Sequence, residues 1–205
     1  MKKVSILWFK KNLRISDNSA LYRASKEQKI AAIYINDPDI INNDDFSYYH
    51  LDFIKESLLE LEIIFKKNKS SFNVYYDKAI NVLKKINETY SIGKIITHYE
   101  TGNWVTYCRD KIITNYCKEN GIELLEYQSN GIVRNLSDRD GWSHRWNKEM
   151  IKDQISTPHV SGFLDLNAQS VHESFQKIKI KKKKYNKIFF GGESHATNTL
   201  HSFLN

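Results

Sequence analysis

The sequence predicts an α/β protein, in which a doubly wound sheet of five parallel strands carries helices on both faces. Three observations support this prediction. Apolar runs and amphipathic helical patterns alternate through the first 130 residues. The apolar runs are nearly continuous, as expected of strands that are buried on both faces. Turn residues and glycines separate the two kinds of pattern.

Five short apolar runs are the predicted strands. The first, VSILWF, contains one polar residue in six, and the second, IAAIYI, contains none. Runs of this length and composition are typical of buried parallel strands rather than of half-exposed ones. The predicted strands are residues 4–9, 30–35, 73–76, 94–99 and 122–127.

Helical patterns fill the gaps between these strands. The first helix should begin at Ser16 or Asp17, because either side chain is a good N-cap. Gly93 and Gly121 are expected to end the helices before the fourth and fifth strands, as glycines at helix C-termini commonly do. Apolar stripes at helical spacing mark the three longer helices. These stripes cover residues 51–65, 79–86 and 104–116.

Strict strand–helix alternation with right-handed crossovers favours the Rossmann-like strand order 3-2-1-4-5. Ligands of such sheets bind outside the carboxyl ends of the strands, where the order reverses. Here the reversal falls between the first and fourth strands, so the turns after the first, second and fourth strands should form a site. The candidate cofactor-binding residues are Phe9, Lys10, Asn12, Asn36, Asp37, Glu100, Thr101 and Gly102.

Two of these residues suggest the kind of ligand. Lys10 lies beside the N-terminus of the first helix, a position that suits a phosphate, a carboxylate or an anionic ring. Gly102 has no side chain, so a flat ring could approach the backbone there. The alternative is that Lys10 and Lys11 only point to solvent.

Several classes of protein lack their sequence signature here. The chain has no G-x-G-x-x-G fingerprint, no phosphate-binding loop and no nucleophile elbow. No spacing of histidines or cysteines predicts a metal site, and no catalytic residue stands out. No apolar run could span a membrane, and the N-terminal run predicts a strand rather than a signal peptide. Cys108 and Cys117, nine residues apart, would face opposite sides of a helix, which favours a reduced, cytoplasmic setting.

The net charge of +7 is interpreted mainly as solvated surface. The densest basic run is KIKIKKKK, residues 177–184. Lysine runs contact phosphates without reading bases, so we expect at most weak, salt-sensitive binding of DNA.

The regular pattern fades after residue 130, and residues 131–205 are interpreted as a linker-like segment. Gly191, Gly192 and Glu193 are expected to form a turn that opens a last helix. That helix carries an apolar stripe at its outer end, which predicts a partner surface. The stripe consists of Ala196, Leu200, Phe203 and Leu204.

The stretch LWFKKNLRISDNSAL, residues 7–21, resembles the opening of DNA photolyases and cryptochromes. Lysines replace the two arginines of the family pattern at positions 10 and 11, and Asn12 replaces an aspartate. Four further segments resemble the family in the right order: AAIYINDPDI, HYETGNWVTYCRDKI, SDRDGW and GGESHATNTLHSFL. The matching residues of the opening stretch are Trp8, Phe9, Leu13, Arg14, Asp17 and Asn18.

The resemblance implies that residues 1–130 form a photolyase-type α/β domain. In many members this domain holds a light-harvesting antenna chromophore, which is a folate, a deazaflavin or a flavin. The helical domain that holds FAD and the DNA lesion would begin where this chain stops, so we expect it to be absent here. Light-driven repair would then require a separate helical FAD-binding subunit, bound through the last helix, and the chain alone would be inactive.

Two other functions fit the sequence as well. One is an autonomous nucleotide- or flavin-binding module. The other is a non-catalytic remnant or interaction scaffold.

Overall fold

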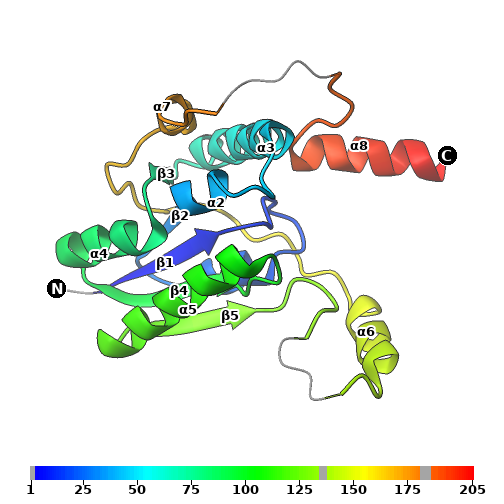
Figure 1. The fold of residues 1–205 in the computed structure, drawn as a ribbon, viewed down its shortest axis with the longest axis horizontal. Coiled ribbons are helices and arrows are strands. Elements are labelled where there is room, and N and C mark those ends of the chain that lie inside the picture. Colours follow the sequence, from blue (N-terminus) through cyan, green and yellow to red (C-terminus); the bar gives the residue numbers. More distant parts are fainter. Residues whose placement is uncertain (1–2, 134–137, 181–185) are drawn as a thin grey trace.

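The computed structural model describes residues 3–133, 138–180 and 186–205 (Figure 1). Its centre is one sheet of five strands, in the order β3-β2-β1-β4-β5. All four neighbouring pairs are parallel, which confirms the predicted architecture and strand order. The strands are β1 (Val4–Phe9), β2 (Ile30–Asn36), β3 (Phe72–Tyr76), β4 (Ile92–His98) and β5 (Glu123–Tyr127).

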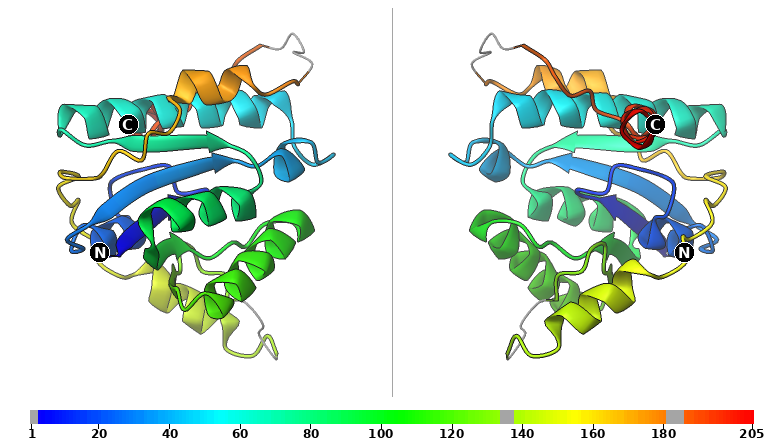
Figure 2. Two further views of the ribbon diagram at one scale, coloured as in Figure 1. Left: turned by 90° about the vertical axis from the view of Figure 1, so that its left-hand side faces the viewer. Right: turned by 90° about the vertical axis from the view of Figure 1, so that its right-hand side faces the viewer.

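Helices cover both faces of the sheet (Figure 2). The helices α1, α3 and α7 pack on one face, and α4 and α5 pack on the other. Successive residues of a strand point to opposite faces, so Leu7 and Phe9 join the first layer, and Ile6 and Trp8 join the second. The helices are α1 (Ser19–Ala24), α2 (Pro38–Ile41), α3 (Tyr48–Lys67), α4 (Ala79–Tyr90), α5 (Trp104–Glu119), α6 (Trp142–Met150), α7 (Val171–Gln176) and α8 (Glu193–Leu204).

The first helix begins later than its sequence predicts. Its N-cap is Asn18, whose side chain accepts a hydrogen bond from the Leu21 amide at 2.9 Å. Asp17 adopts a left-handed conformation with a φ of 46°, which places it outside the helix. The expectation of a start at Ser16 or Asp17 is therefore wrong, because the turn before the helix is longer than the capping pattern suggests.

Only one of the two predicted helix-ending glycines has that role. Gly121 has a φ of 62° and directly follows the last residues of α5, as predicted. Gly93 instead lies inside β4, and Ser91 takes the left-handed conformation with a φ of 56° at the end of α4. At the end of α4 it is therefore a serine, and not the predicted glycine, that adopts a positive φ, which is uncommon for a residue with a side chain.

Part of the predicted linker segment packs into the core of the α/β domain. Val160 and Phe163 are buried in the layer that α3 covers. The Leu164 amide donates to the Ile30 carbonyl at 2.8 Å, and the Leu166 amide donates to the Asn73 side chain at 2.8 Å. The chain after α6 therefore returns to the sheet and completes its hydrophobic layer.

Two further expectations from the sequence concern membrane-spanning helices and the two cysteines. Among the described residues, no helix is both long enough and apolar enough to cross a membrane. Cys117 is buried and Cys108 is partly exposed, and both are free. Burial raises the pKa of the Cys117 thiol to about 11, which keeps it protonated and unreactive. The lysines at 181–184, the last four residues of the predicted DNA-contacting run, lie outside the described residues.

Candidate functional site

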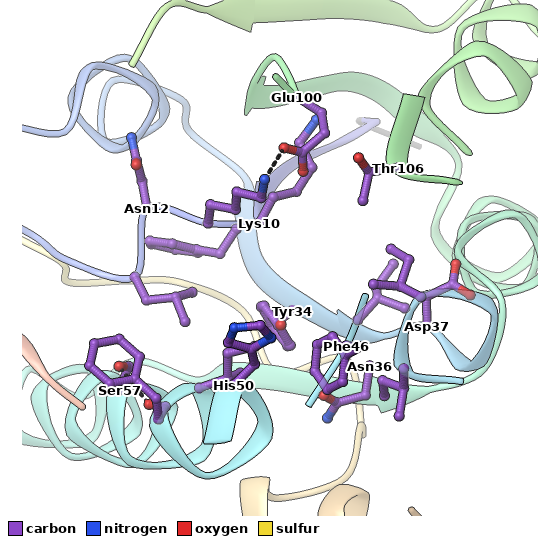
Figure 3. Close-up of a pocket in the computed structure, with 18 of the residues that line it drawn as sticks. Lys10, Asn12, Tyr34, Asn36, Asp37, Phe46, His50, Ser57, Glu100 and Thr106 are labelled. Carbon is purple, nitrogen blue, oxygen red and sulfur yellow. Dashed lines mark hydrogen bonds and ion pairs between the residues drawn. The ribbon is translucent and has the colours of Figure 1, made fainter. Parts of the chain in front are cut away.

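A pocket of about 610 Å³ opens at the carboxyl ends of β1 and β2 (Figure 3). The loop after β1 forms one side, α3 forms the opposite side, and residues of α5 and the start of α8 complete the wall. A smaller cavity of about 280 Å³ lies on the β4 and β5 side of the same loop. Both cavities lie where the strand order reverses, which is the position expected from the topology.

The structure brings six of the eight candidate residues to the larger pocket. Of the other two, Thr101 lines the smaller cavity. Gly102 lies behind Lys11, because a Cβ atom at Gly102 would lie 2.5 Å from the Lys11 Nζ atom. The space that was expected to admit a ring over Gly102 is thus occupied by a side chain of the protein. The six residues in the larger pocket are Phe9, Lys10, Asn12, Asn36, Asp37 and Glu100.

Lys10 is buried in an ion pair with Asp110 of α5. The Nζ and Oδ2 atoms are 3.0 Å apart, and the two side chains are only 5% and 7% exposed. Arg109 bonds to Asp110 at 2.9 Å, and both cations lie about 5 Å from the Trp8 ring centroid. The alternative that Lys10 points to solvent is therefore wrong.

Glu100 connects this ion pair to the surface. Its carboxylate lies 2.9 Å from the Nζ atom of Lys11, which is 62% exposed, and 3.5 Å from Arg109. The network of Lys10, Lys11, Arg109, Glu100 and Asp110 thus contains three cations and two anions, which leaves one positive charge. Burial acts to raise the pKa of Asp110, but the two cations beside it hold that pKa below its usual value. Over the whole pocket lining the formal charges balance, because the cations Lys10, Lys11, Arg14 and Arg109 are matched by the anions Asp37, Asp45, Glu100 and Glu193.

Asn36 and Asp37 line the pocket but use their polar atoms within the fold. The two carboxylate oxygens of Asp37 accept hydrogen bonds from the Asp39 amide at 3.0 Å and the Ala79 amide at 2.9 Å. The Asn36 amide donates to the Ser174 hydroxyl at 2.9 Å. These two residues position α2, α4 and α7 around the pocket, and their contact with a ligand stays a prediction.

The aromatic wall of the pocket was not among the residues predicted from the sequence. Tyr34 points to the pocket from β2, and Phe46 and His50 face it from the segment around the start of α3 (Figure 3). Phe53 of α3 also lines the pocket. Burial raises the pKa of the Tyr34 phenol above its ordinary value, so this hydroxyl stays protonated. Tyr34 lies two residues before the candidate Asn36, on the same face of the strand, and this period-2 relation could have identified it.

His98, at the end of β4, lies beside the smaller cavity. Its Nε2 atom is 3.1 Å from the Ser19 hydroxyl. Burial lowers the pKa of His98 from 6.5 to about 4, and the positive charges of Lys10 and Arg14 act in the same direction. The imidazole is therefore neutral in the folded protein at neutral pH.

We expect this neutral histidine to make the protein less stable in mild acid. Between pH 6.5 and 4 the unfolded chain binds a proton at this position and the folded chain does not, so stability falls as the pH falls. A shift of this size corresponds to a loss of about 3 kcal/mol over that interval. Carboxyl groups with a lowered pKa, such as Asp110, lose their stabilisation only at lower pH.

Urea unfolding at a series of pH values between 4 and 7 measures this loss. His98→Gln should flatten the dependence in that interval, whereas His144→Gln on the exposed helix α6 should leave it unchanged. An unchanged slope in His98→Gln would contradict the prediction.

A parallel 3-2-1-4-5 sheet with a pocket at its switch point defines a doubly wound, Rossmann-like α/β domain. The family model for DNA photolyase matches residues 5–138. The chain therefore belongs to the DNA photolyase family, and it is an N-terminal α/β domain of the photolyase and cryptochrome type.

Curated relatives are similar over part of their length. The deoxyribodipyrimidine photo-lyase of Buchnera aphidicola is 24% identical over 151 residues, which cover 66% of this chain and 29% of the relative. The (6-4)DNA photolyase of Arabidopsis thaliana is 25% identical over 131 residues, which cover 59% of this chain and 23% of the relative. The chain thus spans less than a third of the length of these relatives.

Solved structures match nearly the whole chain. The archaeal photolyase from Sulfolobus tokodaii, whose structure contains two FAD molecules, is 25% identical and superposes with a TM-score of 0.78. The match covers 97% of this chain and 46% of that protein. A bacterial class III photolyase from Agrobacterium tumefaciens has the same fold, with a TM-score of 0.77 at 16% identity over 100% of this chain and 45% of that one.

Proposed function

We propose that the larger pocket binds a light-harvesting antenna chromophore, which is a folate, a deazaflavin or a flavin. The observation that carries this proposal is an aromatic-lined cavity of about 610 Å³ at the switch point of a photolyase-type sheet. This volume is within the range of sites that bind small organic ligands. The second FAD of the Sulfolobus tokodaii photolyase, discussed there as a novel light-harvesting cofactor, makes a flavin the first ligand to test.

The lining of the pocket suits a flat ring that carries polar groups. Phe9, Tyr34 and Phe46 supply flat apolar surfaces on which a heteroaromatic ring can stack. The side chains of Lys11, Asn12 and Glu100 supply polar contacts on the opposite side. A bound chromophore absorbs light, and the residues of this chain hold its ring in a fixed orientation and shield it from water.

Light-driven DNA repair would also require FAD, which we propose is held by a separate helical domain. The surface for that partner is the outer face of α8, where Leu200, Phe203 and Leu204 are 54%, 84% and 71% exposed. Ala196, the first residue of the predicted stripe, lines the pocket. Ile188 and Phe189, before this helix, are also exposed, at 75% and 73%. Apolar groups gathered in this way are typical of a surface that another protein or domain covers.

The described part of the basic run is expected to add at most weak contact with DNA phosphates.

Titration of the purified protein with riboflavin, FMN and FAD, and with a reduced folate, tests the pocket directly. Ala196→Trp places a large ring at the wall where α8 meets the pocket. We expect flavin affinity to fall by roughly 100-fold. That loss is close to about 3 kcal/mol, the upper end of the cost of inserting extra atoms into a packed site. Asn198→Trp, two residues along the same exposed helix and outside the pocket wall, is the matched control and should bind like the unaltered protein. Absence of binding by every ligand, or equal affinity in both variants, would overturn the proposed site.

A further inference from the structure

The segment at the start of α8 is bonded to the loop after β1, although the two are far apart in sequence. The Glu193 carboxylate accepts hydrogen bonds from the Ile15 amide at 2.8 Å and from the Ser16 amide at 3.1 Å, across 178 and 177 residues of chain. Charge-assisted bonds to two successive amides fix the position of that loop relative to α8. The loop includes Asn12 and Arg14, which line the pocket.

The same segment is also bonded to α3, on the opposite side of the pocket. The Gly191 amide donates to the Glu56 carboxylate at 2.8 Å, and the Gly192 amide donates to the Ser57 hydroxyl at 3.0 Å. The Ser194 hydroxyl donates to the Glu60 carboxylate at 2.6 Å. Residues 191–194, which we call the clamp segment, therefore join the loop after β1 to α3.

The two glycines permit this close approach. A Cβ atom on Gly191 would lie 2.0 Å from the carbonyl oxygen of Phe53 in the backbone of α3, so no larger residue fits without a shift. Gly192 has a φ of 110°, a conformation that side chains rarely adopt, and its Cβ atom would lie 2.0 Å from the Glu60 carboxylate. The geometry of the clamp segment thus favours glycine at both positions.

The clamp segment also forms part of the pocket wall. Gly192, Glu193 and Ala196 line the pocket, whereas Gly191, Ser194 and Glu60 lie outside it. The bonds of these outer residues therefore determine where the wall lies, without contact with the pocket interior. Figure 1 shows that α8 continues from this wall and projects away from the sheet.

We propose that Glu193 is a positioning residue that couples the pocket to α8. Docking of the clamp segment on α3 holds the loop after β1 in its ligand-binding position, and a bound ligand in turn holds α8 in place. This inference rests on the proposed function, because it takes the pocket to be a ligand site. Coupling between two sites is reciprocal, so each event must favour the other by the same factor.

Glu60→Ala is the test variant, since it removes the bonds to Ser194 and leaves every pocket-lining residue unchanged. We expect its FMN affinity to fall by roughly 5- to 100-fold, the range typical of coupled sites. The matched control is Glu88→Ala, an exposed glutamate on α4, which should bind FMN with unaltered affinity. A ligand-free readout is hydrogen exchange at the Ile15 and Ser16 amides, which should be faster in Glu60→Ala only.

The reciprocal experiment uses the unaltered protein. Saturating FMN should slow hydrogen exchange and limited proteolysis of residues 191–205. Equal FMN affinity in Glu60→Ala and Glu88→Ala would overturn the coupling while leaving the ligand site intact. If the unaltered protein binds no ligand, the proposed function fails, and unaltered exchange at Ile15 and Ser16 in Glu60→Ala would separately refute the role of the clamp segment.

Discussion

Replacing Asp110 by asparagine is expected to lower the free energy of unfolding by about 3–5 kcal/mol, the cost of leaving a buried charge without its partner. Lys10 and Asp110 are both nearly excluded from water, and their atoms are 3.0 Å apart. Arg109 also bonds to this carboxylate. Removal of the negative charge leaves two cations close together beneath the pocket, where water cannot solvate them fully.

A double variant separates the charge effect from a loss of packing. Lys10→Met combined with Asp110→Asn removes the unpaired ammonium, so much of the stability should return. The control is Lys85→Met, which breaks an exposed lysine–aspartate pair of the same 3.0 Å length and should cost less than about 1 kcal/mol. Denaturant unfolding of the four proteins measures these values. A double variant as unstable as Asp110→Asn would show that the buried charge is not the cause.

This stabilising role has a consequence for the ligand site. Lys10 is a candidate ligand contact, yet its ammonium is already paired within the fold. A loss of ligand affinity in a Lys10 variant would therefore have two causes, the lost ligand contact and the broken ion pair with Asp110. Substitutions on α8, which leave the ion pair intact, give a cleaner test of the pocket.

Replacing Phe65 by alanine is expected to cost about 3–5 kcal/mol, the range for truncation of a fully buried phenylalanine. The side chain is 0% exposed and lies at the centre of an aromatic cluster. Its ring centroid is 5.3 Å from that of Phe72, 5.1 Å from that of Phe163 and 6.3 Å from that of Phe9. One ring thus joins α3, two strands and the segment that returns after α6.

Phe203→Ala makes the same truncation at an exposed position of α8 and should change stability by less than about 0.5 kcal/mol. Both variants can be compared by thermal and denaturant unfolding. Equal stability of the two would contradict the assignment of Phe65 to the core. Because Phe163 belongs to this cluster, Phe65→Ala should also loosen residues 160–166, which increased proteolysis of that segment would reveal.

Much of the architecture can be predicted from the sequence because its cause is local. Strands that are buried on both faces require continuous apolar runs, and amphipathic helices repeat their apolar residues every three or four positions. Alternation of the two kinds of element then leaves few topologies, and the switch point follows from the strand order. Six of the eight candidate residues reach the pocket because each lies at the end of a strand or in the turn after a strand that ends at this edge.

The contacts within the site depend on the tertiary structure. Lys10 pairs with a carboxylate 100 residues away, and Glu193 bonds to amides 177 and 178 residues away. No sequence period encodes such pairs, because they depend on how far each helix extends and on where it packs against the sheet. Gly102 shows the same limit, since the side chain that fills the space beside it comes from Lys11 in another loop. The sequence by itself thus determined the sheet and the edge where a ligand would bind. Only the packing of α3, α5 and α8 around that edge decided which charges are neutralised and which side chains face the pocket.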